Sequence, residues 1–225
     1  MDTDTVDSVE LAADGTYRWA YSGGGVLSGG ALLIDVEERG RWRVARGWIE
    51  FECEQVLDHG LASDRRLSSC GIVACWRGRR CFLPERDIVA FANVLNSGFD
   101  LSPRFLLAET PEGATYPQSE FTLPPEYAGY VLAEPVIATV LTSVDRRALG
   151  ESGDRVEFTL DRGAADGLRV GHELWTLDLP SADEIPWSGR LVEVGEHRSR
   201  GRMRFTPFVP TVGTRMSTRD PRAER

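Results

Sequence analysis

Lysine is absent from this chain of 225 residues, so all 26 of its basic residues are arginine. A phosphate-binding P-loop needs a lysine followed directly by Ser or Thr, and the glycine-rich stretch from Ser22 to Gly30 has no such pair. The stretch also lacks G-x-G-x-x-G spacing, and no helical pattern follows it. We therefore predict a hairpin tip at Ser22 to Gly30 and no nucleotide site.

Long apolar runs are also missing. No stretch reaches the roughly 18 apolar residues that a membrane-spanning helix requires. The first ten residues, MDTDTVDSVE, are acidic and lack the basic and apolar regions of a signal peptide. We expect a protein that does not span a membrane and that is cytoplasmic as the sequence stands. A truncated start would instead allow a periplasmic or envelope location.

Positive charge is scarce in the first half of the chain. The net charge is −9 overall, with −8 on residues 1–130 and −1 on residues 131–225. Broad binding of nucleic acid needs a basic surface, so this balance argues against it. Hydrophobic residues at 41% and charged residues at 27% are typical of a soluble globular protein.

Motifs of known catalytic chemistry are missing as well. The chain contains no G-x-S-x-G and no H-E-x-x-H. Its three histidines, His59, His172 and His197, do not stand at metal-ligand spacing, and we predict surface or loop positions for them. No catalytic, cofactor-binding or metal-binding residue is assigned, and no cofactor is expected.

The four cysteines, Cys53, Cys70, Cys75 and Cys81, leave three alternatives open. A three-residue turn at 77–79 would place Cys75 opposite Cys81, where the Cβ separation suits a disulfide. The thiols could instead be free and serve as small apolar core residues. A zinc site is the third alternative, although C-x₄-C and C-x₅-C lack the close C-x₂-C pair of most zinc sites.

Alternating apolar residues predict an N-terminal antiparallel β domain over residues 1–109. The turn signals are Asp14-Gly15, Glu38-Arg39-Gly40 and Arg46-Gly47. One helix is predicted over 85–97, because Pro84 begins an apolar stripe that ends at Gly98. The strands are predicted at 6–11, 16–21, 31–36, 41–45, 48–54, 71–76 and 79–83. Residues 49, 51 and 53 are expected to be buried, with Glu50, Glu52 and Glu54 on the solvated face.

A proline-rich linker with a short helix is predicted at 110–133, followed by a small β-barrel at 134–219 and a tail at 220–225. The barrel pattern is clearest from Val156 to Leu179, where two alternating segments flank a loop with glycines at 163, 167 and 171. Further strands are predicted at 136–144, 189–195, 200–205 and 212–218. The predicted fold class is therefore mainly β, with one helix in the N-terminal domain and a C-terminal barrel.

The run LDRGAADGLRVGHEL, with the later strands G-R-L-V-E-V and V-G-T-R-M, is similar to a bacterial pattern of about 60 residues. It resembles the small β-barrel domains of the rod-shape scaffold protein MreC and of flagellar assembly protein T. The whole chain resembles uncharacterised bacterial proteins that join a D-G-T-Y-R-W / G-x-W-R-V half to such a barrel. This resemblance implies an envelope scaffold without catalysis and transfers no site residue.

Two further patterns suggest binding surfaces. Arg198, Arg200, Arg202 and Arg204 alternate, so on a strand they would line one face and could bind an anion or an acidic partner. In the alternative, a turn at His197-Arg198 sets Glu193 opposite Arg202 and the face is ordinary. The six tryptophans could form a sugar-stacking platform, or they could pack in the cores.

The leading hypothesis from the sequence is a non-catalytic interaction or scaffold protein, with another protein or an anionic polymer as its partner. The alternative is a binding module for carbohydrate or another small polar ligand. A third is an unrecognised hydrolase, which would need carboxylates or histidines that converge in a pocket.

Overall fold

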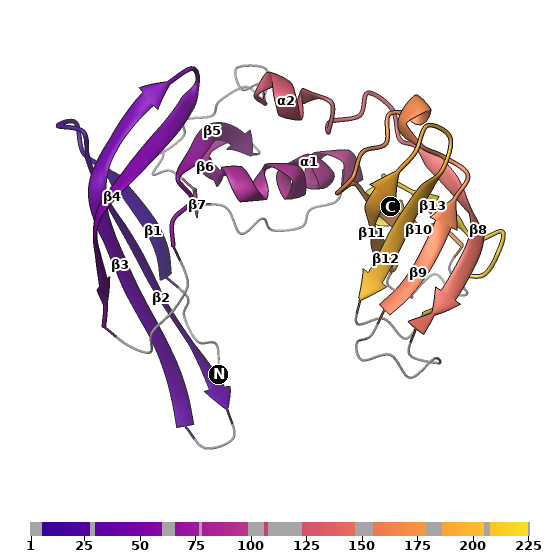
Figure 1. Cartoon of the computed structure of the whole chain (residues 1–225), viewed down its shortest axis with the longest axis horizontal. Helices are drawn as coiled ribbons and strands as arrows, with labels where there is room; N and C mark the ends of the chain where they lie inside the picture. The colour runs from indigo at the N-terminus through magenta and orange to yellow at the C-terminus, as the bar shows by residue number, and fades with distance from the viewer. Residues whose placement is uncertain are drawn as a thin grey trace. The chain divides into compact units, whose positions relative to one another are not determined.

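The computed structural model describes residues 6–27, 30–59, 66–76, 78–98, 106–107, 123–146, 155–178, 186–204 and 208–224. The chain forms two compact units, Met1–Ile88 with Arg104–Pro124 and Val89–Pro103 with Pro125–Arg225. The first carries an open antiparallel sheet and the second a closed barrel, which confirms the predicted mainly β fold class (Figure 1).

The sheet of the first unit has seven strands in sequence order. Its core side is aromatic, because period-two alternation along one strand buries Tyr17, Trp19 and Tyr21. The turns at Gly15 (φ 84°) and at Arg46-Gly47 (φ 53° and 84°) have the positive φ that tight hairpins need, as predicted. The strands are β1 Val6–Leu11, β2 Thr16–Leu27, β3 Gly30–Ala45, β4 Trp48–Asp58, β5 Cys70–Trp76, β6 Arg79–Pro84 and β7 Leu106–Leu107.

Two predicted breaks in this sheet are strand instead. The glycine-rich stretch that follows Tyr21 continues β2 as far as Leu27 and pairs with the start of β3. The predicted turn at residues 38–40 is continuous strand in β3. The register with β4 shifts between Arg39 and Gly40, because β4 carries one extra residue, Glu54, in a β-bulge. A Cβ at Gly40 would lie 2.0 Å from the carbonyl oxygen of Glu52, so the close approach of the strands requires glycine there.

All four cysteines are free, so the free-thiol alternative is the one that the structure shows, and the disulfide considered between Cys75 and Cys81 is not formed. Trp76 pairs with Arg79, so the turn holds two residues and not the three we predicted. Cys75 therefore pairs with Arg80, and Cys81 pairs with Ala74. A one-residue change of register moves a side chain to the opposite face, which separates the two thiols. Burial raises the pKa of Cys81 to about 11, so this thiol stays protonated.

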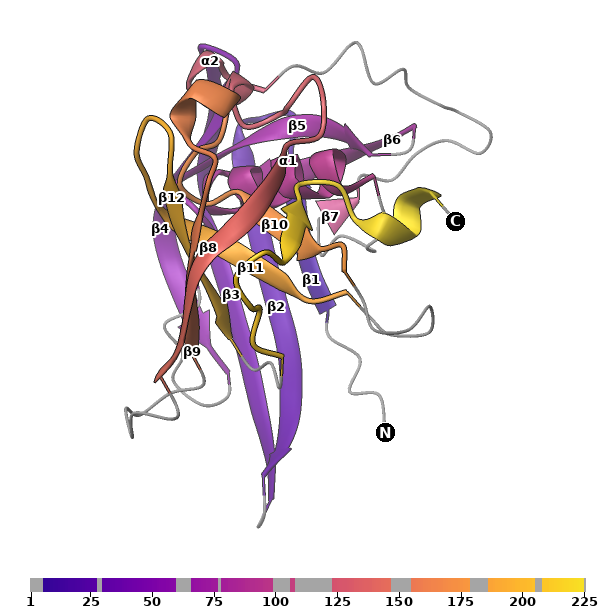
Figure 2. The same cartoon turned by 90° about the vertical axis from the view of Figure 1, so that its right-hand side faces the viewer.

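The barrel of the second unit has six strands in the closed order β10-β11-β12-β9-β8-β13 (Figure 2). Every strand predicted in this region is present. Phe158 fills the barrel between two glycines, since a Cβ at Gly189 or Gly201 would lie 2.6 or 2.3 Å from its ring. The strands are β8 Ile137–Asp145, β9 Arg155–Leu160, β10 Glu173–Thr176, β11 Ser188–Val194, β12 Ser199–Arg204 and β13 Arg215–Ser217.

The predicted helix is present as a 3-10 turn, η1 (Glu85–Asp87), followed by α1 (Ile88–Ser97). We predicted it as part of the N-terminal domain, but from Val89 onward it belongs to the second unit. Two amide side chains on α1 explain this difference. Asn93 binds the carbonyl oxygen of Gly171 and the N–H of Glu173, and Asn96 binds the backbone of Tyr130 and Leu132. None of the helices described has the length and apolar character to cross a bilayer.

The segments on either side of the barrel are fixed to it. The short helix predicted within the linker is present as α2 (Pro125–Ala128), while residues 110–122 of the predicted linker lie outside the described ranges. Residues 220–224, which we predicted to be a tail, include the 3-10 helix η5 (Pro221–Glu224). Asp220 is fully buried, its N–H donates to the carbonyl oxygen of Ser97, and its carboxylate accepts from Arg222.

Candidate functional site

The glycine loop between β9 and β10 is occupied by the protein's own hydrogen bonds. The N–H groups of Ala164 and Ala165 donate to the carbonyl oxygens of Gly195 and Glu196, at 2.8 and 2.9 Å. A Cβ at Gly163 would lie 2.3 Å from the Gly195 oxygen, so its glycine allows this packing. The short 3-10 helix η4 (Ala164–Asp166) completes the loop. Its backbone groups therefore hold the next hairpin and form no cradle for an anion.

His172 is buried and neutral, which corrects the prediction of a surface or loop position. Its Nδ1 accepts from the N–H of Arg169 at 3.1 Å, so Nε2 carries the proton and donates to the Tyr130 carbonyl oxygen at 3.0 Å. Burial lowers the pKa of the imidazole. Both nitrogens are used within the fold, so His172 holds the residues after α2 and is no candidate for catalysis. His59 and His197 are exposed, as predicted.

The predicted row of arginines lies largely on β12. Buried Ser199, Gly201 and Met203 alternate with Arg200, Arg202 and Arg204, so these three arginines share the outer face of the barrel. Arg198 precedes the strand and lies in a turn. A hydrogen bond from the N–H of Gly195 to the carbonyl oxygen of Arg198 closes this turn. Along a strand, residues two apart are separated by about 6.8 Å, which sets the spacing of the row.

Two arginines of the row are neutralised by glutamates. Arg200 Nη2 lies 3.0 Å from Glu193 Oε2. Arg202 Nε donates to Glu157 at 3.0 Å, and Arg146 reaches the other oxygen of the same carboxylate at 3.0 Å. These two guanidinium groups, Arg146 first, hold the pKa of Glu157 below its usual value. We had considered Glu193 opposite Arg202, but the turn holds four residues and not two, which sets Glu193 opposite Arg200.

The residue directly opposite Arg202 on β11 is another arginine, Arg190. Like charges in such a pair oppose each other and destabilise the sheet. Among the residues that the structure describes, no carboxylate lies within ion-pair distance of Arg190, Arg198 or Arg204, and all three are exposed. Glu173 pairs with Arg190 in register, yet its carboxylate accepts the hydroxyl of Ser188.

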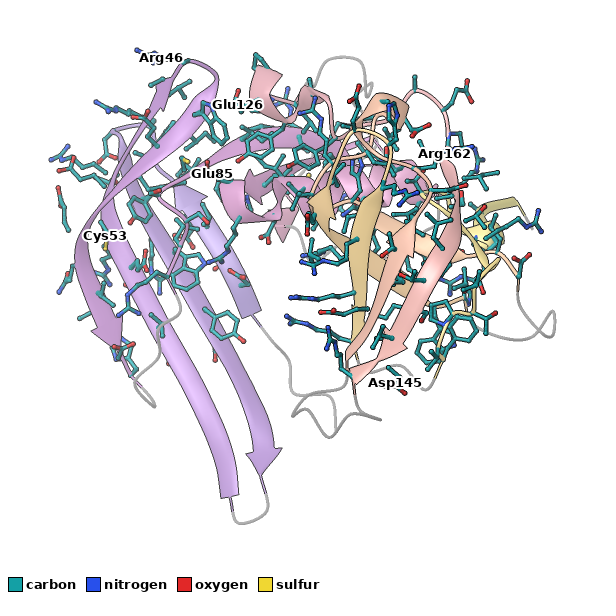
Figure 3. All side chains as sticks on the ribbon, turned by 45° about the vertical axis from the view of Figure 1, so that its right-hand side comes forward. Arg46, Cys53, Glu85, Glu126, Asp145 and Arg162 are labelled. Carbon is teal, nitrogen blue, oxygen red and sulfur yellow. The ribbon has the colours of Figure 1, made fainter. Side chains whose placement is uncertain are left out.

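Arg190 is the residue that the sequence prediction missed. It stands outside the alternating run, and only the four-residue turn and the bulge bring it beside Arg202. We define the arginine face as Arg190, Arg198, Arg200, Arg202 and Arg204. In Figure 3, Arg162 and Asp145 mark the two ends of the barrel along which this face runs.

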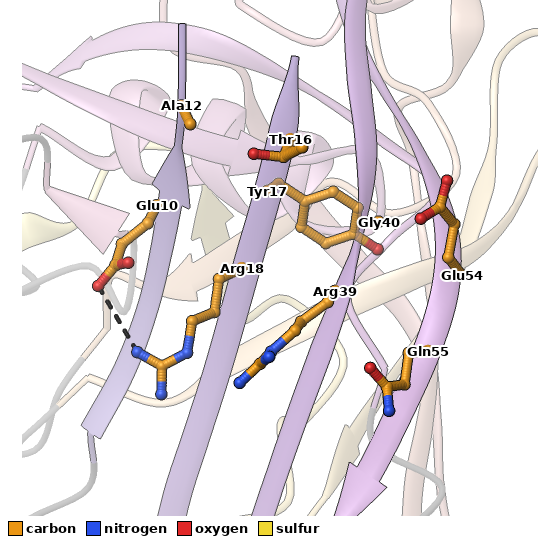
Figure 4. A pocket seen from close by; sticks show the side chains of 9 residues that line it. All are labelled: Glu10, Ala12, Thr16, Tyr17, Arg18, Arg39, Gly40, Glu54 and Gln55. Carbon is orange, nitrogen blue, oxygen red and sulfur yellow. Dashed lines mark ion pairs between the residues drawn. The ribbon is translucent and has the colours of Figure 1, made fainter. Parts of the chain in front are cut away.

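A hollow of about 790 Å³ lies on the sheet of the first unit (Figure 4). Its arginines are already engaged, because Arg18 and Arg39 both bind the carboxylate of Glu37 and lower its pKa to about 2. Arg18 also lies 3.8 Å from Glu10. The lining residues are Glu10, Ala12, Thr16, Tyr17, Arg18, Arg39, Gly40, Glu54 and Gln55.

The structure offers little for carbohydrate or hydrolytic chemistry. Trp19 and Trp175 are buried, and Trp42, Trp48 and Trp187 are partly buried, so none of these side chains forms an exposed stacking platform. The side chain of Trp76 lies outside those described. Glu50 and Glu54 pair with arginines of β3 on a solvated sheet face, as expected, but Cys53, which we expected to be buried, is exposed. Within the described ranges, no three His, Cys, Asp or Glu residues converge on a metal position.

The chain matches no protein-family model, no curated protein and no solved structure. The resemblance to the barrels of MreC and flagellar assembly protein T is therefore an expectation from the residues alone. Any functional conclusion depends on the surface of this molecule.

Proposed function

We propose that this protein is a non-catalytic interaction module whose C-terminal barrel binds an acidic segment of a partner protein through the arginine face. The observation that carries the proposal is the Arg190–Arg202 pair, two like charges side by side, of which only Arg202 has a carboxylate partner among the described residues. A bound carboxylate would relieve this repulsion. Guanidinium groups form bidentate hydrogen bonds with carboxylates, which gives such contacts geometric specificity.

The mixed charge of this surface favours an acidic protein over a uniformly charged polyanion. Glu157 and Glu193 lie among the arginines and would repel a dense row of phosphates or sulfates. A protein segment can place its carboxylates against Arg190 and Arg204 and leave the glutamates uncovered. Complementary charge of this kind raises the association rate and selects the partner.

The test is binding to poly-L-glutamate, measured by titration calorimetry at about 20 mM salt, where the Debye length exceeds 10 Å. The double variant Arg190→Ser with Arg204→Ser should bind roughly tenfold more weakly, as expected for two exposed charge contacts of about 0.7 kcal/mol each. Neither arginine has an ion-pair partner in the described structure, so the variant should fold normally.

The matched control is Arg41→Ser with Arg43→Ser. These residues are also two apart on one strand, are 65% and 78% exposed, and give the same change of net charge. The control should bind poly-L-glutamate as the unaltered protein does. Equal binding by all three proteins would contradict the proposal. Tighter binding of heparin or polyphosphate than of poly-L-glutamate would show that the partner is not an acidic protein.

A further inference from the structure

The hairpin of β2 and β3 extends beyond the strands on either side of it (Figure 1). Pairing of β1 with β2 reaches only Ser22, and pairing of β3 with β4 begins at Val36. Beyond these residues, Gly23–Leu27 and Gly30–Ile34 pair only with each other in the part of the chain that is described. We call these two segments the arm. Its five residue pairs span about 17 Å, and no other described strand pairs with either outer edge there.

The two strands of the arm differ in composition. Gly23, Gly24 and Gly25 stand opposite Ile34, Leu33 and Leu32. A glycine has no side chain, so these three positions offer no directly opposite side chain for a cross-strand contact. Two-stranded hairpins are marginally stable on their own, and glycine adds to the entropy cost of ordering one. The arm therefore gains stability if a further strand joins it.

The arm is also free of charge. Residues 23–34 contain no acidic or basic residue, although residues 1–130 carry a net charge of −8. Open edge strands are usually protected from pairing by charged residues or proline, and the arm has neither. Two copies of this acidic chain repel each other elsewhere on the first unit, so the arm is the part at which they can approach closely.

We infer that the arm is a self-association site, at which the β3 edge of one copy pairs antiparallel with the β3 edge of a second copy. The two arms then form a four-stranded sheet in the order β2-β3-β3-β2, with residues 32–34 of both copies at its centre. A two-fold axis relates the copies, so one segment supplies both sides of the interface. Backbone hydrogen bonds extend the sheet, as in other strand-addition complexes.

Sedimentation equilibrium over protein concentrations from about 1 to 200 μM tests this inference. The unaltered protein should dimerise, and 500 mM NaCl should preserve or strengthen the dimer, because salt screens the repulsion between two acidic chains. Leu33→Glu places two like charges near the two-fold axis, and it should weaken dimerisation at least tenfold. Near-UV circular dichroism checks that the variant keeps the fold of the first unit.

Val44→Glu is the matched control. Val44 lies on the same strand, is 67% exposed and pairs with Ile49 of β4, where no second copy is expected. This variant should dimerise normally. A monomer at every concentration would overturn the inference, as would a dimer that Leu33→Glu leaves intact. Binding of the monomer to phosphatidylcholine vesicles, lost in Leu33→Glu, would show instead that the arm inserts into lipid.

Discussion

The barrel and the N-terminal sheet differ in whether their outermost strands are paired. In the barrel, β10 pairs with both β11 and β13, so the strand order closes and no edge is left. In the sheet, the order runs from β1 to β7, and the arm of β2 and β3 extends past both neighbours. A closed sheet offers a partner only its outer face, whereas an open sheet also offers backbone hydrogen bonds.

The polar side chains of the two units also act differently. In the second unit, the buried side chains of Asn93 and His172 bind backbone groups of neighbouring segments, and the buried carboxylate of Asp220 accepts from Arg222. In the first unit, buried Glu38 accepts from the N–H of Leu67, while exposed pairs such as Arg43 with Glu50 join neighbouring strands at the surface. A buried polar group that loses its partner is costly, while exposed ion pairs contribute little. The stability of the second unit should therefore be more sensitive to single polar substitutions.

The largest effect is expected from Asn93→Ala. Asn93 is 5% exposed, and its removal leaves the Gly171 carbonyl and the Glu173 N–H without these partners. Each unsatisfied buried group costs about 1–3 kcal/mol, so the free energy of unfolding should fall by about 3 kcal/mol. Urea unfolding measures the loss, and hydrogen exchange should show reduced protection in α1.

The control for this substitution is Arg43→Ala. Its side chain is 78% exposed, so the unfolding free energy should change by less than about 0.5 kcal/mol. Equal effects of the two substitutions would remove the contrast between buried and exposed polar groups.

A smaller effect is expected from Gly201→Ala in the barrel wall. The new Cβ would lie 2.3 Å from the Phe158 ring, which forces the core to shift at a cost of about 2 kcal/mol. Gly195→Ala is the control, because its Cβ meets only the Arg198 carbonyl oxygen, at 3.4 Å. Thermal unfolding should separate the two variants by several degrees. Similar melting temperatures would mean that the ring does not pack tightly on the strand.

The smallest effect is a pH dependence of opposite sign in the two units. Burial lowers the pKa of His172 in the folded state. Below about pH 6.5 this histidine is therefore protonated in the unfolded chain but stays neutral in the folded second unit. Its stability should decline there by at most about 1.4 kcal/mol per pH unit. Burial raises the pKa of Glu38, so the folded first unit retains this proton to higher pH and gains stability as the pH falls toward 4.5.

Urea unfolding at pH 7 and pH 5 tests these signs. His172→Gln should abolish most of the loss in the second unit, and Glu38→Gln should reduce the gain in the first, where burial also raises the pKa of Asp87. Hydrogen exchange resolved by peptide assigns each change to its unit. If both units weaken equally on acidification, neither buried group controls the response.

The sequence predicted the repeating parts of the fold well. Alternation identified the barrel strands, and paired turn residues such as Arg46-Gly47 located the hairpins, because both signals are local. It did not predict the partners of α1, since Asn93 reaches Gly171 across 78 positions in sequence. The apolar stripe of α1 could pack against either unit, so the stripe alone does not identify the unit to which the helix belongs.

The candidate site was predicted only in part. Alternation placed Arg200, Arg202 and Arg204 on one face, and the structure agrees. The position of Arg190 beside Arg202 depends on the length of a turn and on a bulge, and neither has a reliable sequence signal. An error of one residue in turn length likewise placed Cys75 opposite Cys81 in the disulfide alternative, whereas Cys75 pairs with Arg80. Register errors of this size change which residues meet, even where every strand is assigned correctly.

The attachments of α1 have a consequence for synthesis of the chain. The groups that hold the helix belong to Tyr130, Gly171, Glu173 and Asp220, all of which leave the ribosome after it. Before these residues are synthesised, α1 lacks the hydrogen-bond partners of Asn93 and Asn96, and its apolar side chains stay exposed. Most of the first unit precedes α1 in the sequence and can fold early. The second unit can fold only when residues 89–103 meet residues 125–225. A nascent chain paused before residue 171 should therefore be the form most prone to capture by chaperones.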